Sequence, residues 1–200
     1  ITTVDKLIIT HFDSDHIGGA AALLDYAAVG EVLIPSYTKG SSTYRRFATA
    51  METAGIQPTA LTEKLTFELD RTQYTVYPPA RSSYPNNEDN EYSLIVGITH
   101  GENRFLFAGD ALTERLREFT ALDEGKYDFL KVSNYGDYFE GVEAFSQAVS
   151  PTYAVITCSD KNPADARTVA ALEAVGARVY LTRNGSVKVT SDGQTISVLQ

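Results

Sequence analysis

Four metal-binding side chains within six residues constrain this chain more than any other feature of its sequence. They are His11, Asp13, Asp15 and His16. The apolar, β-branched run at residues 6–10 predicts a buried strand before them, and the alanine- and leucine-rich stretch after them predicts a helix. A loop between a strand end and a helix can hold alternate side chains on one side. Imidazole and carboxylate groups are ligands of divalent metals, so the cluster predicts a metal site.

A solvated turn is the alternative for the same cluster, since aspartates also cap helices. Two of the three histidines in the chain fall within this hexapeptide, which favours the metal site. Asp110 adds support because it follows a glycine and the predicted strand at residues 104–107. A carboxylate in that place can bridge two ions about 3.5–4 Å apart. Taken alone, a Gly-Asp pair is also a common turn.

Composition places the chain among globular proteins of about one domain. It has 200 residues, of which 43% are apolar and 22% charged. A chain of this size buries roughly 70% of its unfolded surface and needs no disulfide, which agrees with the single Cys158. The net charge of −9 disfavours binding to nucleic-acid phosphates. No apolar run approaches the roughly 20 residues of a membrane span. The basic pair of Lys126 and Lys131 indicates a solvated face.

The order of the predicted elements indicates an α/β protein. Strands and helices alternate as far as a helix at residues 42–54, and successive strands, expected to be antiparallel, follow between residues 64 and 107, the third of them at residues 91–99. Residues 78–90, rich in Pro, Ser and Asn, predict the longest loop. After residue 113 the alternation returns. There Pro163 predicts the start of a helix, and Asn184-Gly185 and Asp192-Gly193 each predict a hairpin.

Residues 10–19 resemble the metal-binding signature of the metallo-β-lactamase superfamily, His-x-His-x-Asp-His. Asp13 replaces the second histidine, as in the branch that resembles the C-terminal domain of the ComEC/Rec2 competence proteins. Residues 90–96, 105–110, 129–136 and 179–189 match that branch in the same order. The resemblance implies that residues 1–200 form one αββα sandwich. It also implies further strands before the signature, so we expect an N-terminally incomplete fragment with an exposed sheet edge.

The resemblance implies a role for each candidate residue. It assigns His11 and Asp13 to a first metal, Asp15 and His16 to a second, and Asp110 to a position between them. Asp15 would also orient a water that the metals activate for attack on a phosphorus or carbonyl centre. The cofactor we expect is therefore one or two divalent metals, with zinc, manganese and magnesium as candidates.

Two departures from the signature leave the number of metals open at two, one or none. Asn134 and Tyr135 stand where the resemblance predicts two histidines, and residues 158–162 lack a further expected histidine. The carbonyl oxygen of Asn134 is a weaker and harder ligand, which would favour magnesium or manganese over zinc. Tyr135 is a candidate substrate contact or weak ligand, and both residues alternatively fill space only. His100 falls in a predicted turn and is no substitute.

The function we expect is that of a metal-dependent hydrolase acting on a phosphodiester or related ester. Resemblance to the competence proteins implies DNA as the substrate, which the acidic charge disfavours. A second branch releases phosphocholine from cell-wall polymers, and the 12 tyrosines suit such a cationic group better. The alternative is a degenerate binding or scaffold domain that has lost part of its metal site. The start at Ile1 looks processed, so an extracellular or cell-surface location is favoured over a cytoplasmic one.

Overall fold

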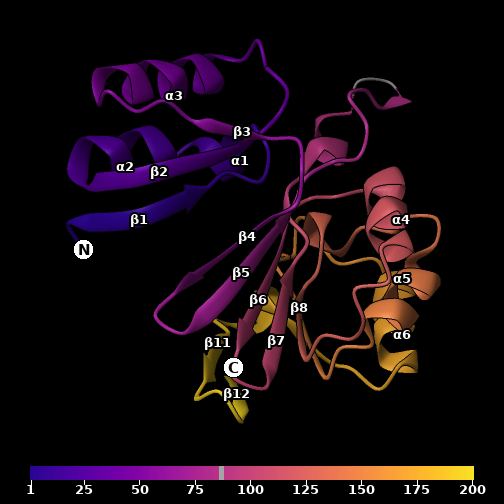
Figure 1. Cartoon of the computed structure of the whole chain (residues 1–200). Helices are drawn as coiled ribbons and strands as arrows, with labels where there is room; N and C mark the ends of the chain where they lie inside the picture. Colours follow the sequence, from indigo (N-terminus) through magenta and orange to yellow (C-terminus); the bar gives the residue numbers. More distant parts are fainter. Residues whose placement is uncertain (86–87) are drawn as a thin grey trace.

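A small parallel sheet at the start of the chain positions the cluster at residues 11–16. The computed structural model describes residues 1–85 and 88–200. The sheet has the order β1-β2-β3, with β1 at Thr3–Ile8, β2 at Ala28–Pro35 and β3 at Thr59–Leu61. Helices α2 (Ala20–Tyr26) and α3 (Ser42–Thr53) cover its outer face, and the short α1 (Ser14–Ile17) carries His16 (Figure 1). Within the described residues β1 pairs only with β2 and is therefore an edge strand.

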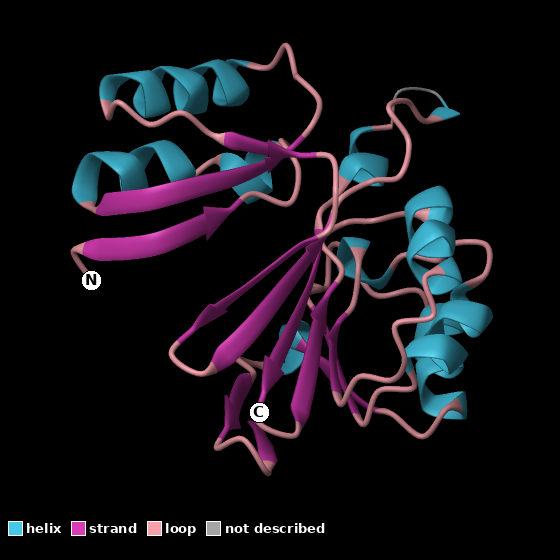
Figure 2. Ribbon diagram, in the orientation of Figure 1, coloured by secondary structure: helices cyan, strands magenta, loops and turns pink. Residues whose placement is uncertain are grey.

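A seven-stranded sheet in the order β10-β9-β8-β7-β6-β5-β4 forms the second half of the fold. Its strands are β4 (Leu65–Leu69), β5 (Thr72–Tyr77), β6 (Ile95–His100), β7 (Asn103–Phe107), β8 (Phe129–Lys131), β9 (Tyr153–Ile156) and β10 (Arg178–Leu181). Strands β4 to β7 are antiparallel, as predicted, and β7 to β10 are parallel. Helices α4 (Thr113–Ala121), α5 (Val142–Val149) and α6 (Ala166–Ala174) cover the outer face of this sheet (Figure 2).

Apolar contacts between the two sheets make the four-layer arrangement. Leu33 and Leu61 of the small sheet form a buried cluster with Val76 and Val96 of the large sheet. Leu94, just before β6, belongs to the same cluster. A larger cluster fills the space between the large sheet and helices α4 to α6. Helices therefore lie outside two packed sheets, which confirms the αββα sandwich. That residues 1–200 are one domain, and that further strands precede them, stay predictions.

The predicted hairpin at Asn184-Gly185 is wrong. Strand β10 pairs with β9, whereas β11 (Lys188–Ser191) pairs with β12 (Ile196–Leu199) in a separate two-stranded sheet. Val187 and Val189 pack with Phe129 and Val155 of the large sheet, so burial across the sheet outweighs the local turn preference. The hairpin at Asp192-Gly193 is confirmed, and the Asp192 carboxylate accepts hydrogen bonds from two backbone N–H groups that follow it.

Two further boundaries differ from the predictions. The strand predicted at residues 91–99 begins only at Ile95, and Glu91 and Tyr92 belong to a 3-10 turn at Asp89–Tyr92, because the Glu91 carboxylate accepts hydrogen bonds from two N–H groups in the first turn of α4. Helix α6 begins at Ala166 rather than Pro163, because the Asp165 side chain caps it.

The loop predicted at residues 78–90 includes residues 86 and 87, which lie outside the described residues. In the described part, Tyr84 is buried and its hydroxyl donates a hydrogen bond to Glu118 of α4, while Arg81 pairs with Glu114. This loop is therefore fastened to α4 on one side. Among the described residues, no helix has the length and apolar character that crossing a membrane requires.

Candidate metal centre

His11, His16 and Asp110 meet where the two sheets join. His11 and His16 lie in the segment that follows β1, His16 within α1, and Asp110 follows β7, so two segments far apart in the sequence supply the donors. One ligand atom from each residue lies within 4.8 Å of the other two. Nε2 of His16 is 3.1 Å from Oδ2 of Asp110. His11 and Asp110 are both buried, and the group offers two imidazoles and one carboxylate for one ion.

Thr10 orients both imidazoles of this group. Its Oγ1 lies 3.1 Å from Nδ1 of His11 and 3.4 Å from Nδ1 of His16. A hydroxyl oxygen can accept two hydrogen bonds, so both Nδ1–H groups can donate to it and both Nε2 atoms face the three-residue group, where Nε2 of His16 lies within hydrogen-bond distance of Asp110. Ser93 adds a weaker contact, because its Oγ is 3.5 Å from the same nitrogen of His11.

Nε2 of His11, the ring nitrogen that faces the three-residue group, has the properties of a metal ligand. Nε2 of His11 is buried and has no hydrogen-bond partner among the described residues. Burial, followed by the neighbouring His16, lowers the pKa of His11 from 6.5 to about 4, so the ring is neutral near pH 7. A neutral imidazole with an unpaired buried nitrogen is the form that binds a divalent metal.

Replacing Thr10 with valine should weaken metal binding by about 10–100-fold, the usual loss when a group that orients a ligand is removed. Valine keeps the branched shape but cannot accept from either Nδ1. Isothermal titration of the metal-free protein with Zn²⁺ measures the effect. Thr10→Ser keeps the hydroxyl and should bind as the parent does, whereas unchanged affinity in Thr10→Val would contradict this role.

Asp110 is held ionised by its neighbours although it is buried. Burial acts to raise its pKa, but the hydrogen bond from His16 and the nearby positive charge of Lys131 keep the pKa below its usual value. Nζ of Lys131 lies 3.8 Å from Oδ1 of Asp110. The prediction that Lys131 belongs to a solvated face is therefore wrong, because only 21% of its side chain is exposed and it faces the site.

Asp13 and Asp15 lie beside the three-residue group rather than in it. The ammonium of Lys39 forms an ion pair with Asp13, and the hydroxyl of Tyr135 donates a hydrogen bond to Asp15. Oδ2 of Asp13 is 3.8 Å from Nε2 of His11, and Oδ2 of Asp15 is 3.6 Å from Nε2 of His16. Asp13 precedes α1 but makes no side-chain cap, which argues against the alternative that it serves only to cap the helix.

The segment expected to carry two histidines comes close to the site through Tyr135 alone. Asn134 and Tyr135 have φ angles of 39° and 53°, the left-handed region that few residues other than glycine adopt. The side-chain nitrogen of Asn134 lies 3.5 Å from Asp137, on the exposed side, and Asn134 is not part of the group. His100 hydrogen-bonds to Ser191 near the β6–β7 turn and takes no part in the site.

Four of the described residues at the site were not predicted from the sequence as site residues, namely Thr10, Lys39, Ser93 and Lys131. Lys39 follows the carboxyl end of β2, which is parallel to β1. The carboxyl ends of parallel strands share one edge of a sheet, so this parallel pairing was the signal that could have found Lys39.

A family model described as the metallo-beta-lactamase superfamily matches residues 1–159. The chain belongs to the metallo-β-lactamase superfamily. Recombination protein 2 of Haemophilus influenzae is 29% identical over 160 residues, which are 80% of this chain and 18% of that protein. ComE operon protein 3 of Bacillus subtilis is 27% identical over 163 residues, which are 81% of this chain and 21% of that protein. The chain therefore spans about a fifth of the length of these relatives.

A solved structure shares the superfamily fold. The structure of Igni18, a metallo hydrolase from the archaeon Ignicoccus hospitalis, aligns with a TM-score of 0.54 at 16% identity. The alignment covers 98% of this chain and 79% of that chain. The metallo-β-lactamase fold generally binds divalent metals, and the grouping of His11, His16 and Asp110 is consistent with that property.

Proposed function

We propose that this chain is a metal-dependent hydrolase that cleaves a phosphodiester or related ester. The buried, unpartnered Nε2 of His11 beside His16 and Asp110 is the observation that carries the proposal. Buried polar atoms are rarely left unpaired, and an unpaired one at a functional site is commonly a place for an ion. Similarity to a metallo hydrolase supports the same class of reaction.

The residues around the group have distinct tasks in this proposal. A divalent ion, when bound, polarises the scissile ester and lowers the pKa of water. Asp15 is the candidate general base, since its side chain is 52% exposed and lies 3.6 Å from His16. Burial acts to raise its pKa, but the hydrogen bond from Tyr135 and the nearby His16 keep it below the usual value, so the carboxylate is ionised. Tyr135 fixes its orientation.

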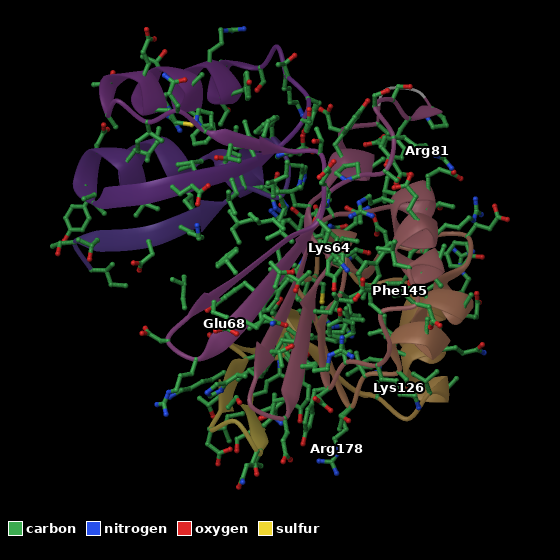
Figure 3. All side chains as sticks on the ribbon, in the orientation of Figure 1. Lys64, Glu68, Arg81, Lys126, Phe145 and Arg178 are labelled. Atoms are coloured by element: carbon green, nitrogen blue, oxygen red, sulfur yellow. The ribbon has the colours of Figure 1, made fainter. Side chains whose placement is uncertain are left out.

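The cavity beside Tyr135 supports a substrate with little negative charge. A cavity of about 260 Å³ adjoins Tyr135, and its lining comprises Tyr135, Thr157, Cys158, Ser159, Asn162 and Thr182. The lining carries hydroxyl and amide groups but no Lys or Arg. The basic side chains at the centre itself, Lys39 and Lys131, face the carboxylates of Asp13 and Asp110. Lys126 and Arg178 lie at the other end of the large sheet (Figure 3). These features favour a small-molecule or cell-wall ester over nucleic acid, whose binding requires basic side chains along its path.

A non-catalytic binding domain is the second candidate. One observation favours it, because Asp13 and Asp15 are already satisfied by Lys39 and Tyr135 of the same chain. A domain of this kind would retain the fold and neither hold a metal firmly nor turn over an ester.

Hydrolysis of bis(p-nitrophenyl) phosphate in added Mn²⁺ or Zn²⁺ tests the proposal. Asp15→Asn should lower kcat by about 10²–10⁴-fold, the contribution of a positioned general base. Asparagine still accepts the hydrogen bond from Tyr135, so the fold and the bound metal should be retained. Metal content and turnover are measured on the same samples. Absence of turnover and of bound metal in the parent would leave the binding-domain candidate.

A further inference from the structure

The five donors at the metal centre divide into two sets. His11, His16 and Asp110 turn their ligand atoms toward one another, within 4.8 Å. Asp13 and Asp15 are instead bound by side chains that come from other parts of the chain, 26 and 120 residues away in the sequence. A second ion would need these two carboxylates, since the first ion uses the other three donors.

Lys39 places a positive charge where a second ion would bind. Its ammonium pairs with both Asp13 and Asp89, so one cation bridges two carboxylates. The side chains of Lys39 and Asp13 are 25% and 32% exposed, which makes this pair less solvent-screened than a surface ion pair. A divalent ion on Asp13 would lie next to the ammonium, and like charges at that separation repel.

The loop that carries Lys39 is fixed by packing. The hydroxyl of Tyr37 accepts a hydrogen bond of 2.9 Å from the backbone N–H of Phe12, beside the cluster. The ring of Tyr37 stacks on Tyr92 with centroids 4.4 Å apart and packs on Phe12 at 4.7 Å. Tyr92 belongs to the same 3-10 turn as Asp89. Lys39 is therefore held over Asp13 by the loops on both of its sides.

Tyr135 binds the carboxylate of Asp15, as Lys39 binds that of Asp13. Its hydroxyl donates to the Asp15 carboxylate, and its left-handed backbone directs the side chain there. The next residue, Gly136, is packed so closely that a Cβ would lie 2.7 Å from Ile156 and 3.2 Å from Ala164. The turn that presents Tyr135 is thus fixed against β9 and the start of α6.

We propose that Lys39 and Tyr135 replace a second metal, so that the centre holds a single divalent ion on His11, His16 and Asp110. This inference rests on the proposed function, because it requires that the centre binds metal. It assigns the two remaining carboxylates to contacts within the chain, with Asp15 still able to accept a proton from water.

Metal stoichiometry tests the inference without reference to activity. The metal-free full chain is saturated with Mn²⁺, passed through a desalting column, and analysed by atomic emission. We expect one equivalent in the parent and a second equivalent in Lys39→Met/Tyr135→Phe, which frees both carboxylates. The control Lys6→Met/Tyr138→Phe should keep one, since Lys6 pairs with Glu31 and the ring of Tyr138 packs against the guanidinium of Arg167, so neither side chain contacts the centre.

The number of bound Mn²⁺ equivalents supports or overturns the single-ion inference in every case. Two equivalents in the parent would overturn the inference and leave the proposed function standing, whereas no retained metal would overturn both. One equivalent in a folded double variant, checked by circular dichroism, would overturn the role of Lys39 and Tyr135. If that variant does not fold, electron paramagnetic resonance of the Mn²⁺-saturated parent decides: isolated ions support the inference, and a spin-coupled pair overturns it.

Discussion

Replacing Asp110 with alanine should abolish both metal retention and ester hydrolysis. Asp110 supplies the only carboxylate of the three-residue group, with Oδ2 3.1 Å from Nε2 of His16. Removing a group that merely orients a ligand costs about 10–100-fold in affinity, so removing a ligand itself should cost more than ~100-fold. Lys131 would also lose the carboxylate that lies 3.8 Å from it, which adds positive charge to the site and opposes cation binding.

Two further variants separate this effect from misfolding. Asp110→Asn keeps the shape of the side chain but not its charge, and should weaken metal binding while leaving the thermal midpoint near that of the parent. His100→Ala removes the histidine that contacts Ser191 near the β6–β7 turn, and should change neither metal content nor turnover. Bound Zn²⁺ after dialysis is the measurement. Retention of a full equivalent by Asp110→Ala would exclude Asp110 as a ligand.

Replacing Arg115 with methionine should have the largest effect on stability, a loss of about 3–5 kcal/mol in the free energy of unfolding. Arg115 is only 1% exposed. Its guanidinium donates to the carbonyl of Ser93 at 3.0 Å and to that of Tyr77 at 2.6 Å, and lies 3.7 Å from Glu118. Methionine fills a similar space but leaves these buried acceptors unpaired, which is the costly case.

Arg117 provides the matched control on the same helix. Its side chain is 55% exposed and pairs with Glu114 one turn earlier, so Arg117→Met should cost no more than about 1 kcal/mol. Urea unfolding followed by circular dichroism compares the two variants. Because Arg115 also holds the backbone of Ser93, whose hydroxyl lies beside His11, we expect weaker metal binding in Arg115→Met. Equal stability of the two variants would contradict this account.

Local patterns sufficed for most of the elements that carry the site. The apolar run before His11 forms β1, and the alternation of strands and helices gives the two halves of the sandwich. Where local rules failed, a contact from a distant segment decided the outcome. The Glu91 carboxylate accepts hydrogen bonds from the start of α4, so its segment does not join β6. Val187 and Val189 pack with Phe129 and Val155 on the large sheet, so their segment does not form a hairpin with β10.

The sequence by itself determined the superfamily and the αββα class. It also determined the five candidate donors, three carboxylates and two imidazoles, which follow β1 and β7. Those features depend on residue types at short spacing, which neighbouring residues control. Only the tertiary structure decided which donors converge. Lys39, Lys131 and Tyr135 reach the centre from separate strands and turns, and their positions follow from the packing of the two sheets rather than from any spacing along the chain. That packing is what divides the five donors into a three-residue group and two carboxylates bound by the chain itself.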